Sequence, residues 1–466
     1  MGLKKKPRTG RALADADRDD KPGLAARQVA TRLLSAVVVS QTSLDGLTDR
    51  KGGHPAFRRL EGRDQSLVRA ILVSALRRRG TLDAILAQCL ERPLPGNADA
   101  LHSLLHTAMA QILFLDVPDS AAVDLAVSQT HGDPRLRRFA GLVNAILRRV
   151  SRERDGLIAG QADPLVDMPK WLQQRLLPAY GTEALAAIAA AHRAIAPVDI
   201  TVRDGDAALW AERLGGHLLS FGTVRLEADP SRPVQELTGF DEGAWWVQDA
   251  AAAIPARLFG AVAGARIADL CAAPGGKTAQ LAAAGAEVTA MDISASRLAR
   301  LEENFQRLRL PVRAVHGDIR QADIVSGGSF DGVLLDAPCS STGTIRRHPD
   351  VAYTKSAEEV DKLAAVQADL LRHAARAVRP GGVLVFSNCS LDPAEGEAIV
   401  EAFLAAHSDY RRKPVTADEL PGLEAAISPA GDVRTTPAMV PDANPALAGL
   451  DGFYAARLLR LPATGG

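Results

Sequence analysis

Residues 265 to 390 alternate between short apolar runs and longer amphipathic segments, and this alternation constrains the fold most strongly. The apolar runs are ARIADL (265–270), EVTAMD (287–292), VRAVHGD (312–318), FDGVLLDAP (330–338) and GVLVFSNCS (382–390). The segments between them include GKTAQLAAAG, ASRLARLEENFQRL and KLAAVQADLLRHAARAVR, which carry apolar residues at helical spacing. This order predicts an α/β fold, a doubly wound parallel sheet covered by helices.

The loop after the first predicted strand, DLCAAPGGKT at 269–278, is rich in glycine. Glycines there let the backbone approach a ligand, and the next helix offers free N–H groups. The loop lacks the G-x-G-x-x-G of dinucleotide sites. Gly276-Lys277-Thr278 match the end of a phosphate-binding loop, but Cys271 stands where its first glycine belongs. S-adenosylmethionine remains, because it carries no phosphate.

Three aspartates follow successive strands of the predicted sheet, where ligands bind in such folds. Asp292 is placed for two ribose hydroxyls, and Asp318 for an adenine edge. Asp336 ends the fourth strand. One strand-end Asp is more often a helix cap, but three in successive loops favour a ligand site.

Two of the four cysteines also follow strands, Cys339 after Asp336-Ala337-Pro338 and Cys389 after Asn388. A cysteine that ends a buried strand is commonly an inert small hydrophobe. Two thiols in one crevice beside a methyl-donor loop favour chemistry instead. A thiolate that adds to carbon 6 of cytosine makes carbon 5 nucleophilic enough to take a methyl group. Asp336 is placed to hydrogen-bond the N3 edge of the ring, and a second thiol can take part in product release.

The N-terminal part reads as an all-helical domain. Apolar residues recur at three- and four-residue spacing in RQVATRLLSAVVV, QSLVRAILVSALRRR, TLDAILAQCL, ADALHSLLHTAMAQILFL, AAVDLAVSQT and RRFAGLVNAILRRVSRE. Asp83, Asp119 or Ser120, and Asp133 stand where helix caps are expected. We predict a disordered basic tail at 1–23, this domain at 24–155, a small α/β linking region at 160–245 and a catalytic domain at 246–463.

Charge is divided unevenly along the chain. Residues 1–160 hold 26 Lys and Arg against 17 Asp and Glu, a balance of +9, although the whole chain is neutral. The excess lies in clusters such as Arg77-Arg78-Arg79, Arg137-Arg138 and Arg148-Arg149. A solvated basic face explains such a surplus as well as an anionic partner does.

Other features of the composition exclude several classes of protein. No apolar run is long enough to span a bilayer, and the N-terminus lacks the apolar segment of a secretory signal. Four cysteines without framework spacing indicate free thiols in a reducing cytoplasm. No metal is expected, because neither a CxxC pair nor HExxH is present.

The motif set resembles the RNA cytosine-C5 methyltransferases, specifically the bacterial ribosomal RNA branch called the Sun or Fmu (RsmB-like) family. The resemblance rests on DLCAAPGGKT, MDIS, HGD, LLDAPCSSTG, RRHPD and SNCSLDPAEGE, in order, with VQDAAA before them and LDGFYAARL after them. The N-terminal helices resemble the NusB-type RNA-binding domain, through RQVA, VPDSAAVDLAV and GLVNAILRR.

The resemblance implies a class I, Rossmann-like methyltransferase that uses S-adenosylmethionine. It implies Cys389 as the nucleophile and Cys339 as the thiol for product release. The partner would be 16S ribosomal RNA or a pre-ribosomal particle, with no membrane and no metal, and a monomer is expected. The implied cofactor and base site comprises Cys271, Ala272, Ala273, Pro274, Gly275, Gly276, Lys277, Asp292, Arg297, Asp318 and Asp336.

Two departures from the family pattern stand out. Asn388 occupies the position before the nucleophile, where the family usually has Thr. The family's Arg-x-Asn signature falls on ITVR at 200–203, where the Arg and Asn are not in place. The second departure bears on how RNA is gripped rather than on methyl transfer.

Two rival functions stay open at this point. One is a non-catalytic antitermination-type RNA-binding factor, which would have no need of both thiols and the intact loop. The other is a DNA cytosine-C5 methyltransferase, in which the Pro338-Cys339 thiol would be the nucleophile and Cys389 would be needless. The paired thiols and the helical domain favour RNA, whose loop bases can be splayed out.

Overall fold

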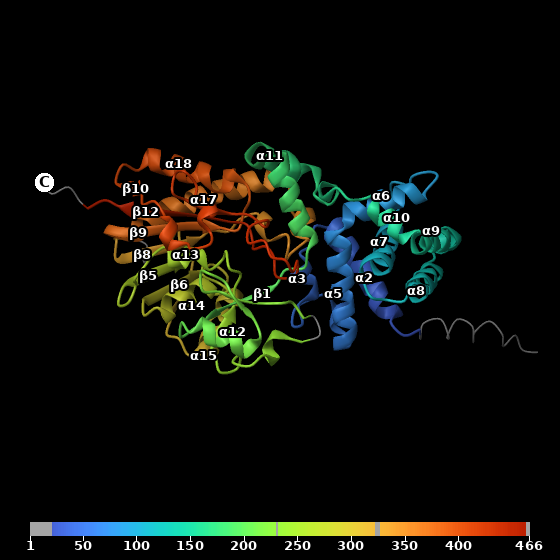
Figure 1. Cartoon of the computed structure of the whole chain (residues 1–466), viewed down its shortest axis with the longest axis horizontal. Helices are drawn as coiled ribbons and strands as arrows, with labels where there is room; N and C mark the ends of the chain where they lie inside the picture. Colours follow the sequence, from blue (N-terminus) through green and yellow to red (C-terminus); the bar gives the residue numbers. More distant parts are fainter. Residues whose placement is uncertain (1–20, 230–231, 322–326, 463–466) are drawn as a thin grey trace, which may run out of the picture. The chain divides into compact units, whose positions relative to one another are not determined.

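The computed structural model describes residues 21–229, 232–321 and 327–462. The chain divides into two compact units, of which one comprises Met1–Pro169 with His348–Thr354 and the other Lys170–Arg347 with Lys355–Gly466 (Figure 1). A short segment of the C-terminal half therefore belongs to the N-terminal unit. The tail expected at 1–23 lies outside the described residues as far as residue 20.

The N-terminal unit is helical, and all six predicted helices are present. Helix α7 is its centre, because apolar residues cover most of its faces and are buried along nearly its whole length. Leu34, Ile71, Leu105 and Val143 come from four different helices and share one core. The helices of this unit are α2 (Leu24–Val38), α3 (Leu44–Thr48), α4 (Pro55–Arg58), α5 (Gly62–Arg77), α6 (Arg79–Cys89), α7 (Asp99–Phe114), α8 (Asp119–Gly132), α9 (Ala140–Arg152), α10 (Arg154–Ala159) and α16 (Val351–Thr354).

Two of the predicted helix caps are wrong. Helix α6 begins at Arg79, directly after α5, so Asp83 lies inside it and caps nothing. Asp119 is the first residue of α8 and accepts hydrogen bonds from Ser151 and Arg154 instead of from its own helix. Asp133 accepts the backbone N–H of Arg135 in the turn that follows α8, which is close to the expected role.

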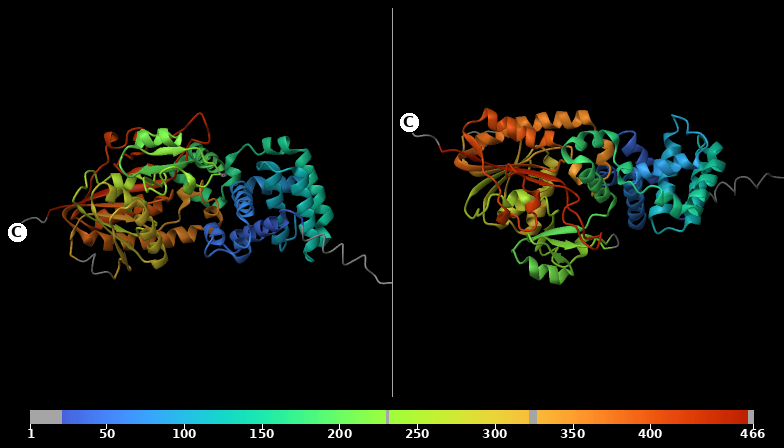
Figure 2. Two further views of the ribbon diagram at one scale, coloured as in Figure 1. Left: turned by 90° about the horizontal axis from the view of Figure 1, so that it is seen from below. Right: turned by 45° about the horizontal axis from the view of Figure 1, so that its top comes forward.

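The second unit opens with α11 (Lys170–Arg193), followed by a small antiparallel sheet of strand order β2-β3-β1-β4. The two strands predicted in this region are both present. Ile200, Trp210, Val224 and Trp245 form the core between this sheet and α12 (Ala207–Leu214). Both views of Figure 2 show α12 and its sheet, in light green, set apart from the main sheet. The strands are β1 (Val198–Val202), β2 (His217–Leu218), β3 (Val224–Leu226) and β4 (Trp245–Val247).

The main sheet has the order β10-β12-β9-β8-β5-β6-β7, with β11 paired to β12. Strands β5 to β9 are parallel to one another as predicted, whereas β12 pairs antiparallel with β9. The chain builds outward from β5 in one direction and from β8 in the other, so the topological switch lies between β5 and β8. The strands are β5 (Arg266–Leu270), β6 (Glu287–Asp292), β7 (Arg313–His316), β8 (Phe330–Asp336), β9 (Val378–Asn388), β10 (Tyr410–Arg412), β11 (Val433–Thr435) and β12 (Phe453–Arg460).

Helices cover both faces of the main sheet, which explains why its strands are apolar on both sides. Leu371 of α17 and Val400 of α18 pack on one face, while Leu281 of α14 and Leu301 of α15 pack on the other (Figure 1). Within the described part of the chain, no helix combines the length and the apolar character needed to cross a bilayer. The helices are α13 (Ile254–Arg257), α14 (Gly276–Ala283), α15 (Ala295–Leu308), α17 (Ala357–Ala377) and α18 (Glu397–Ala406).

Candidate active site

The predicted site residues gather at one edge of the main sheet. Leu270, the last residue of β5, pairs with Met291 of β6 on one side and with Leu335 of β8 on the other. Asp336 of β8 pairs with Ser387 of β9. Because these strands are parallel, the segments that follow them all leave the sheet at its carboxyl edge, where open α/β sheets bind ligands.

The loop from Cys271 to Lys277 turns sharply into α14. Cys271 has a φ of 66° and Gly275 a φ of 103°, both in the region that disfavours a side chain. A Cβ at Gly275 would also lie 3.0 Å from Leu301 Cγ, so only glycine fits there. A cavity of about 340 Å³ adjoins the loop, and its lining includes Ala272, Pro274, Gly275, Gly276, Lys277 and Asp336.

Lys277 and Asp336 form the charged pair of this cavity. Lys277 Nζ lies 2.7 Å from Asp336 Oδ2 and 4.7 Å from the centre of the Phe453 ring. The Ser387 hydroxyl donates to the other oxygen of Asp336 at 2.9 Å. The Asp336 carboxylate is therefore fixed in place, with part of its side chain still open to the cavity.

Asp269 belongs to the same site, although the sequence analysis did not single it out. It is the penultimate residue of β5, lines the cavity and accepts a hydrogen bond of 2.6 Å from Thr278. Burial raises the pKa of Asp269 to about 7. Its position inside an apolar strand was the available signal, since a carboxylate is rarely placed there without a partner.

Asp292 is fully buried at the end of β6, where three groups hold it. The backbone N–H groups of Ala273 and Ser294 donate to it at 3.2 and 2.8 Å, and Arg297 contacts both of its oxygens at 2.8 Å. Arg297 thus covers the carboxylate that the sequence analysis assigned to a ribose. Asp318 is held in the same manner by Arg320, which lowers its pKa.

The two predicted thiols lie side by side. Cys339 Sγ is 3.4 Å from Cys389 Sγ, and the Ser341 hydroxyl is 3.5 Å from Cys389 Sγ. The hydrogen bond from the Cys339 thiol lowers the pKa of Cys389, and the same bond raises the pKa of Cys339 well above its usual value. Cys389 is therefore the more readily ionised thiol of the pair. Burial raises the pKa of Cys271 to about 12, so that thiol stays protonated.

A buried polar network fixes the two cysteine loops to each other. The backbone N–H of Gly343 donates to Cys389 O at 2.9 Å, and the Ser340 and Ser390 hydroxyls are 3.2 Å apart. The Asn388 amide donates to Gln367 of α17 and to the Glu395 carbonyl. Asn388, which departs from the family pattern, therefore fixes the end of β9 and with it the position of Cys389.

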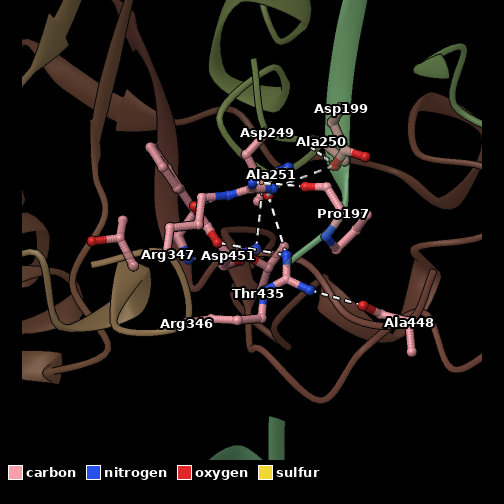
Figure 3. Close-up of polar contacts among 12 residues, drawn as sticks. Pro197, Asp199, Asp249, Ala250, Ala251, Arg346, Arg347, Thr435, Ala448 and Asp451 are labelled. Atoms are coloured by element: carbon pink, nitrogen blue, oxygen red, sulfur yellow. Dashed lines mark hydrogen bonds and ion pairs between the residues drawn. The ribbon is translucent and has the colours of Figure 1, made fainter. Parts of the chain in front are cut away.

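The RRHPD motif supplies a second buried network, drawn in Figure 3. Arg347 donates to Asp249 at 2.5 Å and lies 3.2 Å from Asp451, and Arg346 lies 3.4 Å from Asp249. Arg347 also donates to the Pro197 carbonyl, beside the small sheet. Arg346 and Arg347 thus hold the segment that follows β4 and the segment that precedes β12 together, and Asp249 also lines the cavity.

Comparison with known proteins shows which family this chain belongs to. A family model described as 16S rRNA methyltransferase RsmB/F matches residues 258–459, and a NusB family model matches residues 24–152. Ribosomal RNA small subunit methyltransferase B of Xanthomonas campestris pv. campestris is 38% identical over 411 residues, covering 85% of this chain and 91% of that protein. The chain belongs to the ribosomal RNA small subunit methyltransferase B family.

Further matches support this membership of the methyltransferase B family. The protein of the same name from Pseudomonas putida is 34% identical, covering 94% of this chain and 99% of its own length. A solved methyltransferase homolog protein from Pyrococcus horikoshii superposes with a TM-score of 0.53 at 25% identity, covering 64% of this chain and 98% of that one. The resemblance, the NusB-like helical region and the Rossmann-like fold predicted from the sequence are confirmed.

Proposed function

We propose that this methyltransferase B family member transfers a methyl group from S-adenosylmethionine to carbon 5 of a cytosine in 16S ribosomal RNA, through a covalent bond between Cys389 and carbon 6. The observation that carries the proposal is the pair of Sγ atoms 3.4 Å apart at the ends of β8 and β9, adjacent to Asp336. The names of the family model and of the relatives support small-subunit ribosomal RNA as the substrate.

The residues of the chain divide the reaction between them. The Cys389 thiolate forms a bond to carbon 6, and the electron pair of the C5–C6 double bond makes carbon 5 nucleophilic. Asp336, held by Lys277 and Ser387, enters this step as the carboxylic acid and shares its proton with N3 as negative charge develops on the ring. Bound S-adenosylmethionine supplies the methyl group that becomes attached to carbon 5.

Release of the product is assigned to Cys339. The electron pair of the C5–H bond restores the C5–C6 double bond, and the bond between Cys389 Sγ and carbon 6 breaks. Cys339 Sγ lies next to the sulfur that is expelled, so it can give its proton to the departing Cys389 thiolate and, as a thiolate, take the proton from carbon 5.

The cofactor is proposed to bind along Cys271 to Lys277, with its ribose on Asp292 and its adenine near Asp318. Two hydroxyl groups would replace the Arg297 guanidinium, which is the more exposed partner of Asp292. Asp292→Ala should weaken binding of S-adenosylhomocysteine by about 1–3 kcal/mol, the usual cost of a hydrogen bond to a charged group.

The helical unit is proposed to supply part of the electrostatic grip on RNA. Arg137, Arg138 and Arg148 are exposed, while Arg79 and Arg149 are committed to Asp83 and Glu153. Replacing the three exposed arginines by Glu should weaken RNA binding and reduce its dependence on salt, because fewer counterions are released. An unchanged salt dependence would leave them as a solvated face.

Single substitutions of the thiols test the proposal. On RNA that lacks the modification, Cys389→Ala should form no covalent adduct and no 5-methylcytosine. Cys339→Ala should methylate once and then persist as a protein–RNA complex on denaturing gels. Cys89→Ala, a free thiol in the helical unit, serves as the matched control and should retain turnover. The DNA-type assignment predicts the reverse pattern, and a trapped complex in Cys389→Ala would overturn the roles proposed here.

A further inference from the structure

Two histidines of the helical unit take no part in the function proposed above. His102 and His106 are one turn apart on α7 in the sequence HSLLH, so their side chains lie on one face of the helix. Asp83, inside α6, faces both of them. The carboxylate and the two imidazoles come from adjacent helices that are joined by the segment 90–98.

The three side chains converge on one point. Asp83 Oδ1 lies 3.1 Å from His106 Nε2 and 3.3 Å from His102 Nε2, and one ligand atom from each residue lies within 4.8 Å of the others. Ligands bound at about 2.0–2.1 Å to a tetrahedral zinc ion are about 3.3 Å apart. The separation of the carboxylate oxygen from each imidazole nitrogen matches that edge length.

His106 is the member of the cluster whose buried ring nitrogens lack hydrogen-bond partners in the described part of the chain. Its side chain is fully buried, and neither ring nitrogen has a hydrogen-bond partner among the residues that the structure describes. Its Nε2 is close to Asp83 Oδ1 but is not aligned for a hydrogen bond. Buried polar atoms are nearly always satisfied, so an unaligned imidazole nitrogen aimed at a carboxylate indicates a third atom between them.

The surroundings leave room for entry and for a further ligand. A cavity of about 500 Å³ is lined by Asp83 and His102, and also by Glu91 and Asp99. Arg79 lies 3.9 Å from the second oxygen of Asp83 while its guanidinium packs over the Tyr353 ring, which leaves Oδ1 directed at the histidines. The two further carboxylates offset the charge of Arg79.

We propose that Asp83, His102 and His106 bind one Zn²⁺ ion, with its fourth position open to this cavity. Imidazole and carboxylate ligands in a tetrahedral arrangement suit zinc, and three protein ligands leave one position for water. Neither CxxC nor HExxH describes this cluster, so the expectation of no metal missed it. The signal that it passed over is the His-x-x-x-His spacing on a helix beside an aspartate.

Zinc titration of the untagged full chain tests the proposal. After removal of metal with a chelator, calorimetry should give one Zn²⁺ per chain for the wild type. His102→Ala and Asp83→Asn should each weaken binding by at least about 100-fold, because even outer-shell partners of a metal are worth about 10–100-fold. Both positions are partly exposed, so these variants test the site even if His106→Ala fails to fold. His131→Ala, a histidine of α8 outside the cluster, is the matched control.

A second measurement separates this site from the paired thiols of the catalytic unit. X-ray absorption of the zinc-loaded protein should show nitrogen and oxygen ligands without sulfur, and Zn²⁺ should raise the melting temperature of the wild type but not that of His102→Ala. Sulfur ligands, or equal zinc affinity in the wild type and His102→Ala, would overturn the proposal.

Discussion

Asp249→Asn tests whether the network of Figure 3 stabilises the second unit. Asp249 is buried between Arg346, which is 1% exposed, and Arg347, and it also accepts the backbone N–H groups of Ala251 and Asp451. Removing one partner of a buried ion pair costs about 3–5 kcal/mol. Arg347 keeps Asp451 as a partner, so we expect a loss near the lower end, about 3 kcal/mol.

Calorimetry and urea unfolding of the full chain measure this loss. The shift is roughly 2 °C per kcal/mol at the upper end of the 150–250-residue range, and the second unit is larger still, so it should melt about 6 °C lower. The matched control is Asp331→Asn, because Asp331 pairs with Arg379 at 2.6 Å but the side chains of Arg379 and Asp331 are 48% and 30% exposed. Such pairs contribute about 0–1 kcal/mol. A loss for Asp249→Asn no larger than that of the control would refute the reasoning.

Three further predictions concern single side chains. Iodoacetamide near neutral pH should alkylate Cys389 faster than Cys271, as mass spectrometry of the peptides will report, because the pKa of Cys389 is lowered and that of Cys271 is raised to about 12. Gly275→Ala should weaken binding of S-adenosylhomocysteine by about 10-fold or more in calorimetry, since its φ of 103° costs any other residue about 1–3 kcal/mol. Arg457 lowers the pKa of Glu419 from 4.5 to about 2, so Glu419→Gln should lower the free energy of unfolding at pH 7. That difference should shrink as the pH falls from 4.5 towards 2, where the wild-type carboxylate becomes protonated.

The helices and strands could be predicted from local sequence patterns. A helix with one buried face shows apolar residues at helical spacing, and a strand buried on both faces shows a continuous apolar run. The run FDGVLLDAP forms the central strand β8, which ends at Asp336. Ligands bind at the carboxyl ends of parallel strands, so Asp336 lies at the site. The closeness of Cys339 and Cys389 followed from the same rule. The difference in pKa between them depends on the single contact of 3.4 Å between the two sulfur atoms, which no spacing in the sequence encodes.

Contacts between distant residues account for what the sequence did not predict. Asp249, Arg347 and Asp451 are about 100 residues apart in succession, so their network has no local signature. Asp83 was read as a cap because it precedes an apolar helical run, but cap formation needs non-helical backbone, and α6 starts earlier. Arg297 above Asp292 was predicted as a cofactor contact, whereas its pairing with that carboxylate appears only in three dimensions.

The segment His348–Thr354 has a consequence for how the chain is made. It belongs to the N-terminal unit, where Asp350 accepts the backbone N–H of Leu44 and the Tyr353 hydroxyl donates to the Leu76 carbonyl. During synthesis the ribosome finishes the rest of that unit about 185 residues before this segment emerges. At about 5–20 residues per second the delay is roughly 10–40 s. The N-terminal unit therefore cannot complete its contacts until residues 348–354 have been made, although the rest of its residues are translated first.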